Sequence, residues 1–380
     1  MLTPFAERDL LERGISRRSF GKIASFLAAG SSLPFNNEMA MAQASKVDAP
    51  PPGAVMINAN ENPLGPCREA LEALRSIAAQ GGRYLYGETD KLQRLLADGE
   101  GLKTDHVRIY PGSSAPLHQT VLAFCSPSKP LVMADPGYEA GGTAAEVVGA
   151  KVFRIPLTKT YAHDVKAMAA VPNSGVIYIT NPNNPTGTAT PKIDIEWLVA
   201  NKPPGSILML DEAYMHISPN PQFNSALVAA GKDIVILRTF SKVYGMAGLR
   251  AGAVLARPDL IEKLDRFSNN GMMPITGMAA ASASLQVKGL VEERRKIIGD
   301  IREDVFAWLR KKNLKFVPSV TNCFMVDTGR PTKDVIAAMQ KENVYIGRPW
   351  PVWPTHVRVT VGTREEMEKF KAAFGKVLSV

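Results

Sequence analysis

Short apolar runs alternate with stretches suited to helices through the middle of this chain, and this pattern restricts its fold more than any other feature. The runs lie at 107–110, 131–134, 152–157, 176–180, 207–210 and 234–237, with 251–255 as a further candidate. Such alternation predicts an α/β domain in which helices flank a mostly parallel sheet. Ligands of these sheets bind at the loops that follow the strands, so function is expected there.

A second region is expected to begin near residue 276. It opens with small residues, continues with a long charged helix over about 291–312, and ends with strand-like runs at 323–326, 344–346 and 357–361. Glu366 stands three residues after Thr363, which predicts a capping box at the start of the last helix. The predicted parts are an arm and helix over 45–82, a large α/β domain over 83–275, and a smaller α+β domain over 276–380 that also packs the arm.

Residues 1–44 have the order of an export signal and are set apart from the predicted fold. Arg17 and Arg18 precede Phe20 and Lys22, and a weakly apolar stretch over 23–33 and two small-residue cleavage patterns within 40–44 follow. This order resembles a bacterial twin-arginine signal, which implies an export machinery as partner and a folded protein delivered to the periplasm or secreted. The alternative is an amphipathic surface helix that carries two adjacent arginines by chance.

Charge and cysteine content argue against several kinds of function. The 45 Lys and Arg residues outnumber the 36 Asp and Glu residues by 9, and they form no dense run with interleaved aromatics. Nucleic-acid binding is therefore not expected, and the excess suits small anionic ligands better. Three separated cysteines and five dispersed histidines form no CxxC or HExxH pattern, so we predict no metal site.

Polar segments follow the predicted strands at regular intervals. In chain order they are 112–114 (GSS), 135–138 (DPGY), 181–187 (NPNNPTG), 211–214 (DEAY) and 239–242 (TFSK), with Arg250 beyond the last. Each segment alone has an ordinary explanation as a turn, a helix cap or a solvated lysine. Their combination in one order is much more specific than any single motif.

Together the segments meet the chemical needs of pyridoxal phosphate. Lys242 supplies the amine that binds the cofactor's aldehyde and later acts as a general base. Asp211 can keep the ring nitrogen protonated, because an adjacent carboxylate favours the cationic form. Tyr214 and Asn184 can hydrogen-bond the ring hydroxyl, and Tyr138 can stack on the ring.

A phosphate site is predicted from the remaining positions. Ser113 and Ser114 lie between a strand and a helix, where backbone N–H groups and the helix dipole face an anion. Thr239 and Ser241 add hydroxyl groups, and Arg250 adds a positive charge.

This set of motifs resembles the fold-type-I aminotransferases over essentially the whole chain after the signal, and most of all the histidinol-phosphate aminotransferase family. The resemblance rests on 60–66 (NENPLGP), 183–187 (NNPTG), Ser241-Lys242 with Gly248-Leu249-Arg250, and 357–363 (VRVTVGT). It implies a transaminase that moves an amino group between an amino acid, or a histidinol-phosphate-like amine, and a 2-oxo acid in two half-reactions.

The resemblance implies further roles. Arg358 would hold the anionic group of the substrate by a two-pronged contact, with Arg348 and Asn62 in the same pocket. Tyr84 would reach the cofactor phosphate of a neighbouring subunit, which implies a homodimer with shared active sites. The family's Pro-Asp after this tyrosine is replaced by Leu85-Tyr86, so Tyr86 is an alternative.

Two questions stay open at the level of sequence. The stretch over 348–358 is shortened and holds Trp350 and Trp353, which alters a wall of the substrate pocket or packs the domains together. Export is an unusual setting for histidine biosynthesis, so a donor other than histidinol phosphate is favoured. A lyase, decarboxylase or oxidase on the same fold is the alternative, because the cofactor activates several bonds of an amino acid.

Overall fold

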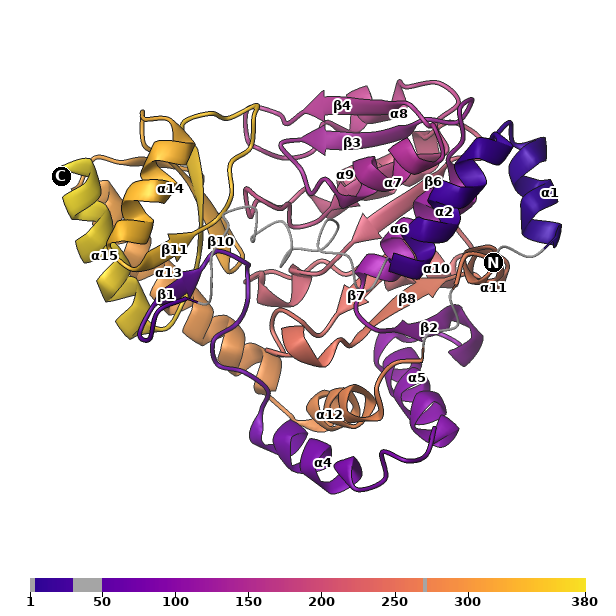
Figure 1. Cartoon of the computed structure of the whole chain (residues 1–380), viewed down its shortest axis with the longest axis horizontal. Coiled ribbons are helices and arrows are strands. Elements are labelled where there is room, and N and C mark those ends of the chain that lie inside the picture. Colours follow the sequence, from indigo (N-terminus) through magenta and orange to yellow (C-terminus); the bar gives the residue numbers. More distant parts are fainter. Residues whose placement is uncertain (1–3, 30–49, 269–271) are drawn as a thin grey trace.

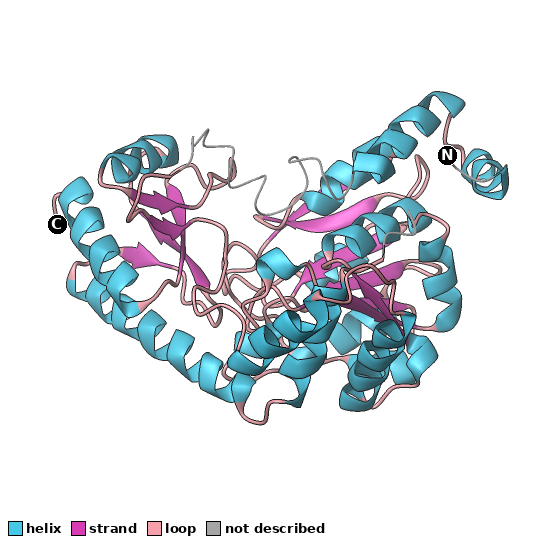
Figure 2. Ribbon diagram, turned by 60° about the horizontal axis from the view of Figure 1, so that its bottom comes forward, coloured by secondary structure: helices cyan, strands magenta, loops and turns pink. Residues whose placement is uncertain are grey.

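The computed structural model describes residues 4–29, 50–268 and 272–380. A large sheet covered by helices forms one body, and a smaller group of strands and helices packs beside it, with the C-terminus at its outer end (Figure 1). Figure 2 shows helices on both sides of the large sheet. The α/β class with a second, smaller α+β part agrees with the sequence expectation.

The large sheet has seven strands in the order β2-β8-β7-β6-β5-β3-β4. Their bounds are β2 (Val107–Tyr110), β3 (Leu131–Asp135), β4 (Val152–Pro156), β5 (Val176–Thr180), β6 (Ile207–Asp211), β7 (Ile234–Thr239) and β8 (Gly252–Ala256). The pairs from β7 through β6, β5 and β3 to β4 are parallel. Strand β8 runs antiparallel to both β7 and β2, so it alone is reversed.

Both faces of this sheet are buried, as a parallel sheet requires. Along β6, Leu208 and Leu210 pack in one hydrophobic cluster, while Ile207 and Met209 pack in a second cluster on the opposite face. The covering helices are α5 (Tyr86–Glu100), α6 (Ser114–Phe124), α7 (Ala140–Val147), α8 (Val165–Ala169), α9 (Lys192–Asn201), α10 (Ser225–Ala229) and α11 (Pro258–Asp265). Short 3-10 turns are η1 (Thr104–His106), η2 (Met215–Ile217) and η3 (Ala247–Leu249).

The strand order changes direction between β3 and β5, since the chain passes from β3 outward to β4 and returns on the other side of β3. Loops after the two strands therefore diverge at this point and leave room for a ligand. The segments 136–138 and 181–187 are these loops.

The smaller part is built on two further sheets. Strands β12 (His356–Thr360), β10 (Cys323–Asp327) and β9 (Lys315–Phe316) form an antiparallel sheet, covered by α13 (Leu290–Lys311), α14 (Thr332–Lys341) and α15 (Arg364–Leu378). In the N-terminal arm, β1 (Val55–Ile57) pairs in parallel with β11 (Val344–Ile346), so the arm packs here as expected. The predicted capping box of Thr363 and Glu366 is present at the start of α15.

Helices α4 (Arg68–Ala78) and α12 (Ile275–Gln286) pack against each other below the large sheet (Figure 1), and α12 also contacts α5. Ile77 of α4 is buried, but Leu71, which shares its apolar spacing, is 36% exposed. Leu71 is therefore a part of this apolar face that the described chain leaves open to solvent.

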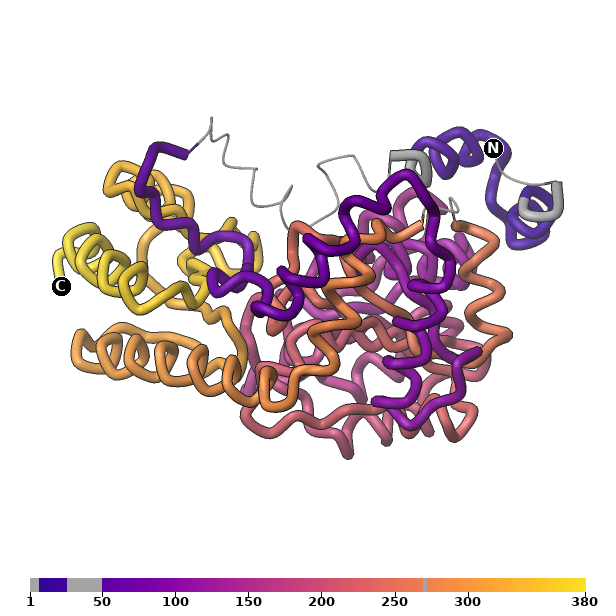
Figure 3. Tube along the Cα trace, turned by 90° about the horizontal axis from the view of Figure 1, so that it is seen from below, coloured from indigo at the N-terminus to yellow at the C-terminus, as the bar shows by residue number. Residues whose placement is uncertain are grey.

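The beginning of the chain, which we set apart from the fold, packs on it. Helices α1 (Pro4–Glu12) and α2 (Arg17–Ala29) lie at the end of the molecule opposite the C-terminus (Figure 3). Leu10, Ile15 and Ile23 are buried in the hydrophobic cluster of α6 and α7. Arg13 donates hydrogen bonds to the carbonyls of Leu122 and Cys125 at the end of α6, where a cation also suits the helix dipole.

Other parts of the proposed signal lie outside the described residues, namely the end of the apolar stretch and the cleavage patterns within 40–44. No helix among the residues that the structure describes is long and apolar enough to cross a bilayer.

Candidate active site

The loops at the carboxyl ends of the large sheet enclose a cavity of about 290 Å³, which we call the site cavity. Ten residues predicted from the sequence line it, and they are Ser113, Ser114, Tyr138, Asn184, Asp211, Tyr214, Thr239, Ser241, Lys242 and Arg250. Three more wall residues, Glu61, Ala213 and Gly248, belong to motifs noted in the sequence, although no role was predicted for them. The sequence did not single out the rest of the wall, which is Ala59, Leu117, Thr180 and Ala247.

An anion cradle is built where β2 runs into α6. Gly112 has a φ of 85°, and a Cβ added there would collide with the guanidinium of Arg250. Ser113 and Ser114 follow at the start of α6, so the first N–H groups of an 11-residue helix open toward the cavity. A side chain at position 112 would force the guanidinium of Arg250 to move, and the positive φ also favours glycine.

Arg250 is held beside the cradle by its own loop. Its Nη1 donates to the carbonyl of Ala247 at 2.9 Å, and its backbone has a left-handed φ of 52°. Burial lowers the pKa of Arg250, an effect that an anion bound next to it would oppose. Thr239 and Ser241 are joined by a 2.9 Å hydroxyl–hydroxyl bond nearby.

Lys242 lies in the loop after β7 and is only 9% exposed. Its Nζ donates to the carbonyl oxygen of Asn60 at 2.9 Å and lies 5.3 Å from the ring centre of Tyr214. A buried amine in the wall of a cavity can react with a bound carbonyl group, whereas most lysines are solvated at the surface.

Asp211 ends β6 with its carboxylate in the site cavity. Burial raises its pKa to about 6, although the backbone N–H of Ala213, the hydroxyl of Tyr178 and the charge of Lys242 act in the opposite direction. The hydroxyl of Tyr178 donates to Oδ2 at 3.2 Å and the N–H of Ala213 to Oδ1 at 3.1 Å. A buried carboxylate with a raised pKa is suited to a cationic partner, which would stabilise its charged form.

Asn60 joins the arm, the smaller domain and the cavity, a role that was not predicted although Asn60 opens the 60–66 motif. Its Nδ2 donates to the hydroxyl oxygen of Tyr214 at 3.0 Å, and its Oδ1 accepts from Thr360 on β12 at 3.0 Å. Its φ of 54° is left-handed, a conformation that asparagine tolerates better than most residues. Its side-chain contacts cross about 150 and 300 positions of sequence, a separation that no local motif reveals.

Arg358 lies behind Asn184 and is fully buried on β12. Its Nη1 donates to Oδ1 of Asn184 at 3.0 Å, and its Nη2 donates to the carbonyl of Asn58 at 2.6 Å. The guanidinium is thus connected to a residue of the cavity wall and held in one orientation.

The other predicted site residues lie outside this wall. Asn62 donates to the carbonyl of Val243 at 3.0 Å and so connects the arm to the loop that carries Lys242. Arg348 is paired with Glu139 through both terminal nitrogens. Tyr84 is 70% exposed and stacks on Tyr86, which is 65% exposed, with ring centres 5.8 Å apart.

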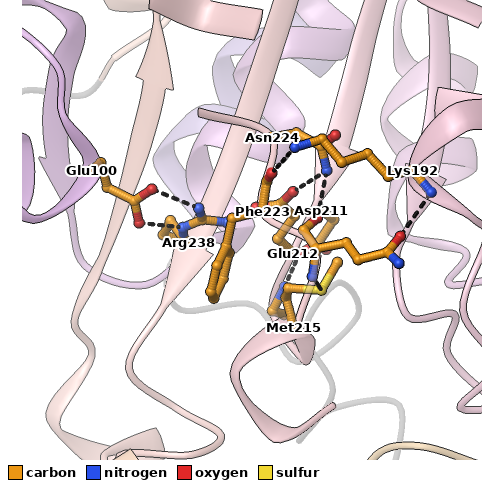
Figure 4. A network of polar contacts seen from close by, with 10 residues as sticks. Glu100, Lys192, Asp211, Glu212, Met215, Phe223, Asn224 and Arg238 are labelled. Atoms are coloured by element: carbon orange, nitrogen blue, oxygen red, sulfur yellow. Dashed lines mark hydrogen bonds and ion pairs between the residues drawn. The ribbon is translucent and has the colours of Figure 1, made fainter. Parts of the chain in front are cut away.

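A buried ion network that was not predicted from the sequence lies under the strand ends. Figure 4 shows the guanidinium of Arg238 between the carboxylates of Glu100 and Glu212, and both pairs are direct ion pairs. Asn224 donates to Glu212 at 2.7 Å, and the ring of Phe223 lies 4.6 Å from Cζ of Arg238. Burial alone would raise the pKa of Glu100, but the charge and hydrogen bonds of Arg238 lower it.

This network connects the ends of the two strands that carry Asp211 and Thr239. Glu212 directly follows Asp211, the last residue of β6, and Arg238 directly precedes Thr239, the last residue of β7. Side chains alternate between the two faces of a strand, so the pair fixes the backbone of both strand ends from the side away from the cavity.

Comparison with known proteins places this architecture in one family. The family described as aminotransferase class I and II matches residues 53–374. The histidinol-phosphate aminotransferase of Symbiobacterium thermophilum is 35% identical over 334 residues, which cover 85% of this chain and 91% of that protein. The histidinol-phosphate aminotransferase of Moorella thermoacetica is 32% identical and covers 86% of each chain.

Solved structures agree with the sequence relatives. A putative histidinol-phosphate aminotransferase from Erwinia carotovora atroseptica has a TM-score of 0.81 at 30% identity, over 85% of this chain and 95% of that one. The Sinorhizobium meliloti histidinol-phosphate aminotransferase, solved in complex with pyridoxal-5'-phosphate, has a TM-score of 0.80 at 25% identity, over 92% and 96%.

Proposed function

The chain belongs to the class I and II aminotransferases, and on that premise we propose which of its residues carry out amino transfer. The protein is a pyridoxal-phosphate-dependent transaminase. The family, the fold type and the cofactor expected from the sequence are thereby confirmed. The roles of single residues, the substrate, the assembly and the location are our proposals.

The residues of the site cavity fit the cofactor. The cradle at Gly112, with Ser113, Ser114 and Arg250, would hold the phosphate, and Thr239 and Ser241 would add hydroxyl donors. Asp211 would hold the cationic ring nitrogen, which explains why a carboxylate is buried in the cavity wall. The observation that carries this assignment is that Lys242, Asp211 and the anion cradle all open into one cavity.

The remaining contacts would orient the ring. Tyr138 would stack against it, and Tyr214 and Asn184 would bond its hydroxyl. When bound, the cofactor supplies a carbonyl carbon that takes up the amino group and a ring that accommodates the electrons released from the substrate.

Proton transfer is assigned to Lys242. Once its Nζ is free, it takes the proton from the α-carbon of the substrate as a general base, and it returns a proton later in the same half-reaction. The hydrogen bond to the carbonyl of Asn60 keeps Nζ directed within the enclosed cavity. A 2-oxo acid acceptor would reverse the steps in the second half-reaction.

Arg358 is proposed to hold the carboxylate of the amino donor. The guanidinium is buried, and its bond to Asn184 places it directly behind the wall of the cavity. A planar fork of donors in a fixed orientation matches a carboxylate with two hydrogen bonds. We expected Asn62 and Arg348 in the same pocket. Asn62 would instead position the loop that carries Lys242, and Arg348 would position the loop that carries Glu139.

We also propose a homodimer in which Tyr84 or Tyr86 completes the neighbouring site. Large apolar side chains are exposed at Leu64, Leu71, Tyr84 and Tyr86, all within 23 residues of the arm and α4–α5 region. Exposed apolar groups that gather in one segment are typical of a surface that another protein covers.

Export by the twin-arginine route is the proposal for location. Arg17 and Arg18 are exposed at the start of α2, although neighbouring side chains of α1 and α2 pack on the enzyme. A receptor can therefore reach the arginine pair on the folded protein. Replacing both arginines by Lys should leave the protein in the cytoplasm, and wild-type protein found there in fractionated cells would contradict the proposal.

The visible absorption spectrum of the holoenzyme tests the reaction. Addition of an amino donor should convert the cofactor to its amine form, and addition of a 2-oxo acid should restore the starting spectrum. The Lys242→Ala protein should lose turnover by about a factor of 1,000 or more. Release of carbon dioxide or uptake of oxygen without conversion would favour the decarboxylase or oxidase alternative.

A further inference from the structure

An ion pair joins the two domains at the edge of the site cavity. Arg348, after β11, donates through Nη1 to Oε1 of Glu139 at 2.8 Å and through Nη2 to Oε2. The Arg348 side chain is 9% exposed and that of Glu139 28%. Glu139 directly follows Tyr138, a residue of the cavity wall, so the pair lies next to the place where a substrate binds.

Trp350 connects this pair to Arg358. Its ring centre lies 4.0 Å from Cζ of Arg348 and 5.2 Å from Cζ of Arg358, and its Nε1 donates to the carbonyl of Gly137 at 3.1 Å. Arg348 is thus fixed by a two-pronged ion pair and by stacking on a fully buried ring. Turning its guanidinium toward a ligand would break both contacts.

The charges around Arg348 cancel its own. Glu139 neutralises it directly, and Asp135, at the end of β3, is a second carboxylate close enough to feel the charge of Glu139. Burial raises the pKa of Asp135, the charge of Arg154 lowers it, and that of Glu139 raises it. Glu139 and Asp135 offset Arg348 and Arg154, so these four groups add no net positive charge to that of Arg358.

A phosphate monoester carries about 1.5 to 2 negative charges near neutral pH. Bound beside Arg348, it would have to displace Glu139 or lie against it, and either arrangement costs binding energy. A single carboxylate requires only one arginine, which Arg358 supplies. The corner therefore acts against phosphate by repulsion as well as by lack of attraction.

We propose that the Glu139–Arg348 pair withdraws Arg348 from anion recognition, so that the site selects amino acids with one carboxylate and an uncharged side chain over amines that carry a phosphate monoester. This inference rests on the proposed transamination and names the class of amino donor. Trp350 stacks on Arg348 and so helps to keep its guanidinium in this pair.

The test compares three holoenzymes, namely the wild type, Glu139→Gln and Glu146→Gln. The first substitution keeps the shape of Glu139 and removes its charge. The second makes the same change of net charge at an exposed position of α7, about two turns away, and serves as the matched control. Each protein is assayed with histidinol phosphate and with a panel of neutral amino acids, and kcat/KM is compared as a ratio.

Wild type should prefer its best neutral amino acid by at least about 100-fold, and Glu139→Gln should narrow the ratio at least about 10-fold, while Glu146→Gln moves it less than about twofold. A wild type that prefers histidinol phosphate, or a Glu139→Gln ratio no different from the control, would overturn the inference.

A binding measurement separates this inference from the reaction itself. Calorimetry on the same holoenzymes with 3-phenylpropionate and phenyl phosphate reports recognition of a carboxylate or a phosphate without any amino transfer. Tighter binding of the carboxylate, with phosphate binding gained in Glu139→Gln, supports the inference even if no donor is converted, in which case only the transaminase proposal fails. Equal or tighter binding of phenyl phosphate by wild type overturns it.

Discussion

Burial of Asp211 lowers the stability of the protein without its cofactor, because the fold raises the pKa of this carboxyl group from 3.8 to about 6. The folded state then binds the proton more tightly than the unfolded state, so stability is lost as pH rises from about 4 to 6 and stays lower above that range. The shift corresponds to about 3 kcal/mol of the free energy of unfolding. A cation placed against the carboxylate would reverse this effect.

The first prediction concerns Asp211→Asn. Above pH 7 the apoprotein should gain about 1–2 kcal/mol in free energy of unfolding. Loss of the buried charge stabilises the fold, and a weakened hydrogen bond offsets part of that gain. The gain should shrink as the pH falls toward 5, and turnover of the holoenzyme should fall about 100-fold or more. Urea unfolding across pH and steady-state assays measure both. An Asn variant that is less stable at every pH would contradict the raised pKa.

Gly112 gives the second prediction at this scale. A Cβ at this position collides with Arg250, and its φ of 85° is unfavourable for any other residue. Gly112→Ala should therefore weaken cofactor binding at least about 10-fold and cost about 1–2 kcal/mol of stability. Gly99→Ala is the control, since Gly99 is exposed in α5, its Cβ meets nothing within 4 Å, and alanine favours a helix. Fluorescence titration with pyridoxal phosphate should separate the two, and equal affinities would argue against the cradle.

At the scale of elements, the strands were readable from sequence because their apolar runs are short and bounded by turn residues. The residues at the strand ends were readable because each carries a functional group that one cofactor requires. The ion network of Glu100, Arg238 and Glu212 was not readable, since a buried charge looks the same in a sequence as a solvated one. The packing of α1 and α2 was missed for a related reason: an apolar stretch beside an arginine pair suits a signal and a docked helix equally well.

Removing one partner of the ion network should lower the free energy of unfolding more than removing both charges of a pair. Arg238→Met leaves Glu212, which is fully buried, without its ion-pair partner and should cost about 3–5 kcal/mol. The double variant with Glu212→Gln should recover at least about 1 kcal/mol, because the unpaired charge is gone. Urea unfolding of the three proteins tests this, and a double variant less stable than Arg238→Met would show that Glu212 is stabilised without Arg238.

At the scale of the whole molecule, two parts contribute to one cavity, and the arm passes between them. The side chain of Asn60 forms hydrogen bonds with Tyr214 of the large domain and Thr360 of the small domain, and its carbonyl oxygen accepts a hydrogen bond from Nζ of Lys242. Contacts between residues this far apart in the sequence arise from tertiary packing, so no local sequence pattern predicts them. The exposed residues that follow the arm, from Leu71 to Tyr86, are the part of this region that the described chain leaves uncovered.

If a second copy covers this surface, inactive subunits should repair one another. A Tyr84→Ala subunit keeps Lys242 but lacks the tyrosine that its partner needs, and a Lys242→Ala subunit has the opposite defect. Unfolding an equal mixture and refolding it should place both changes in one site of each mixed dimer and leave the other site intact. Half of the dimers would be mixed, so about a quarter of wild-type activity should return.

The same mixture with Tyr86→Ala in place of Tyr84→Ala decides which tyrosine is used. Both side chains are about equally exposed and stack on each other, so their surroundings within one chain do not distinguish them. Only the residue that reaches the neighbouring site should lower activity alone, by about 10-fold or more, and regain it on mixing. Activity that stays near wild type in both single variants, or that never returns on mixing, would mean that each subunit completes its own site.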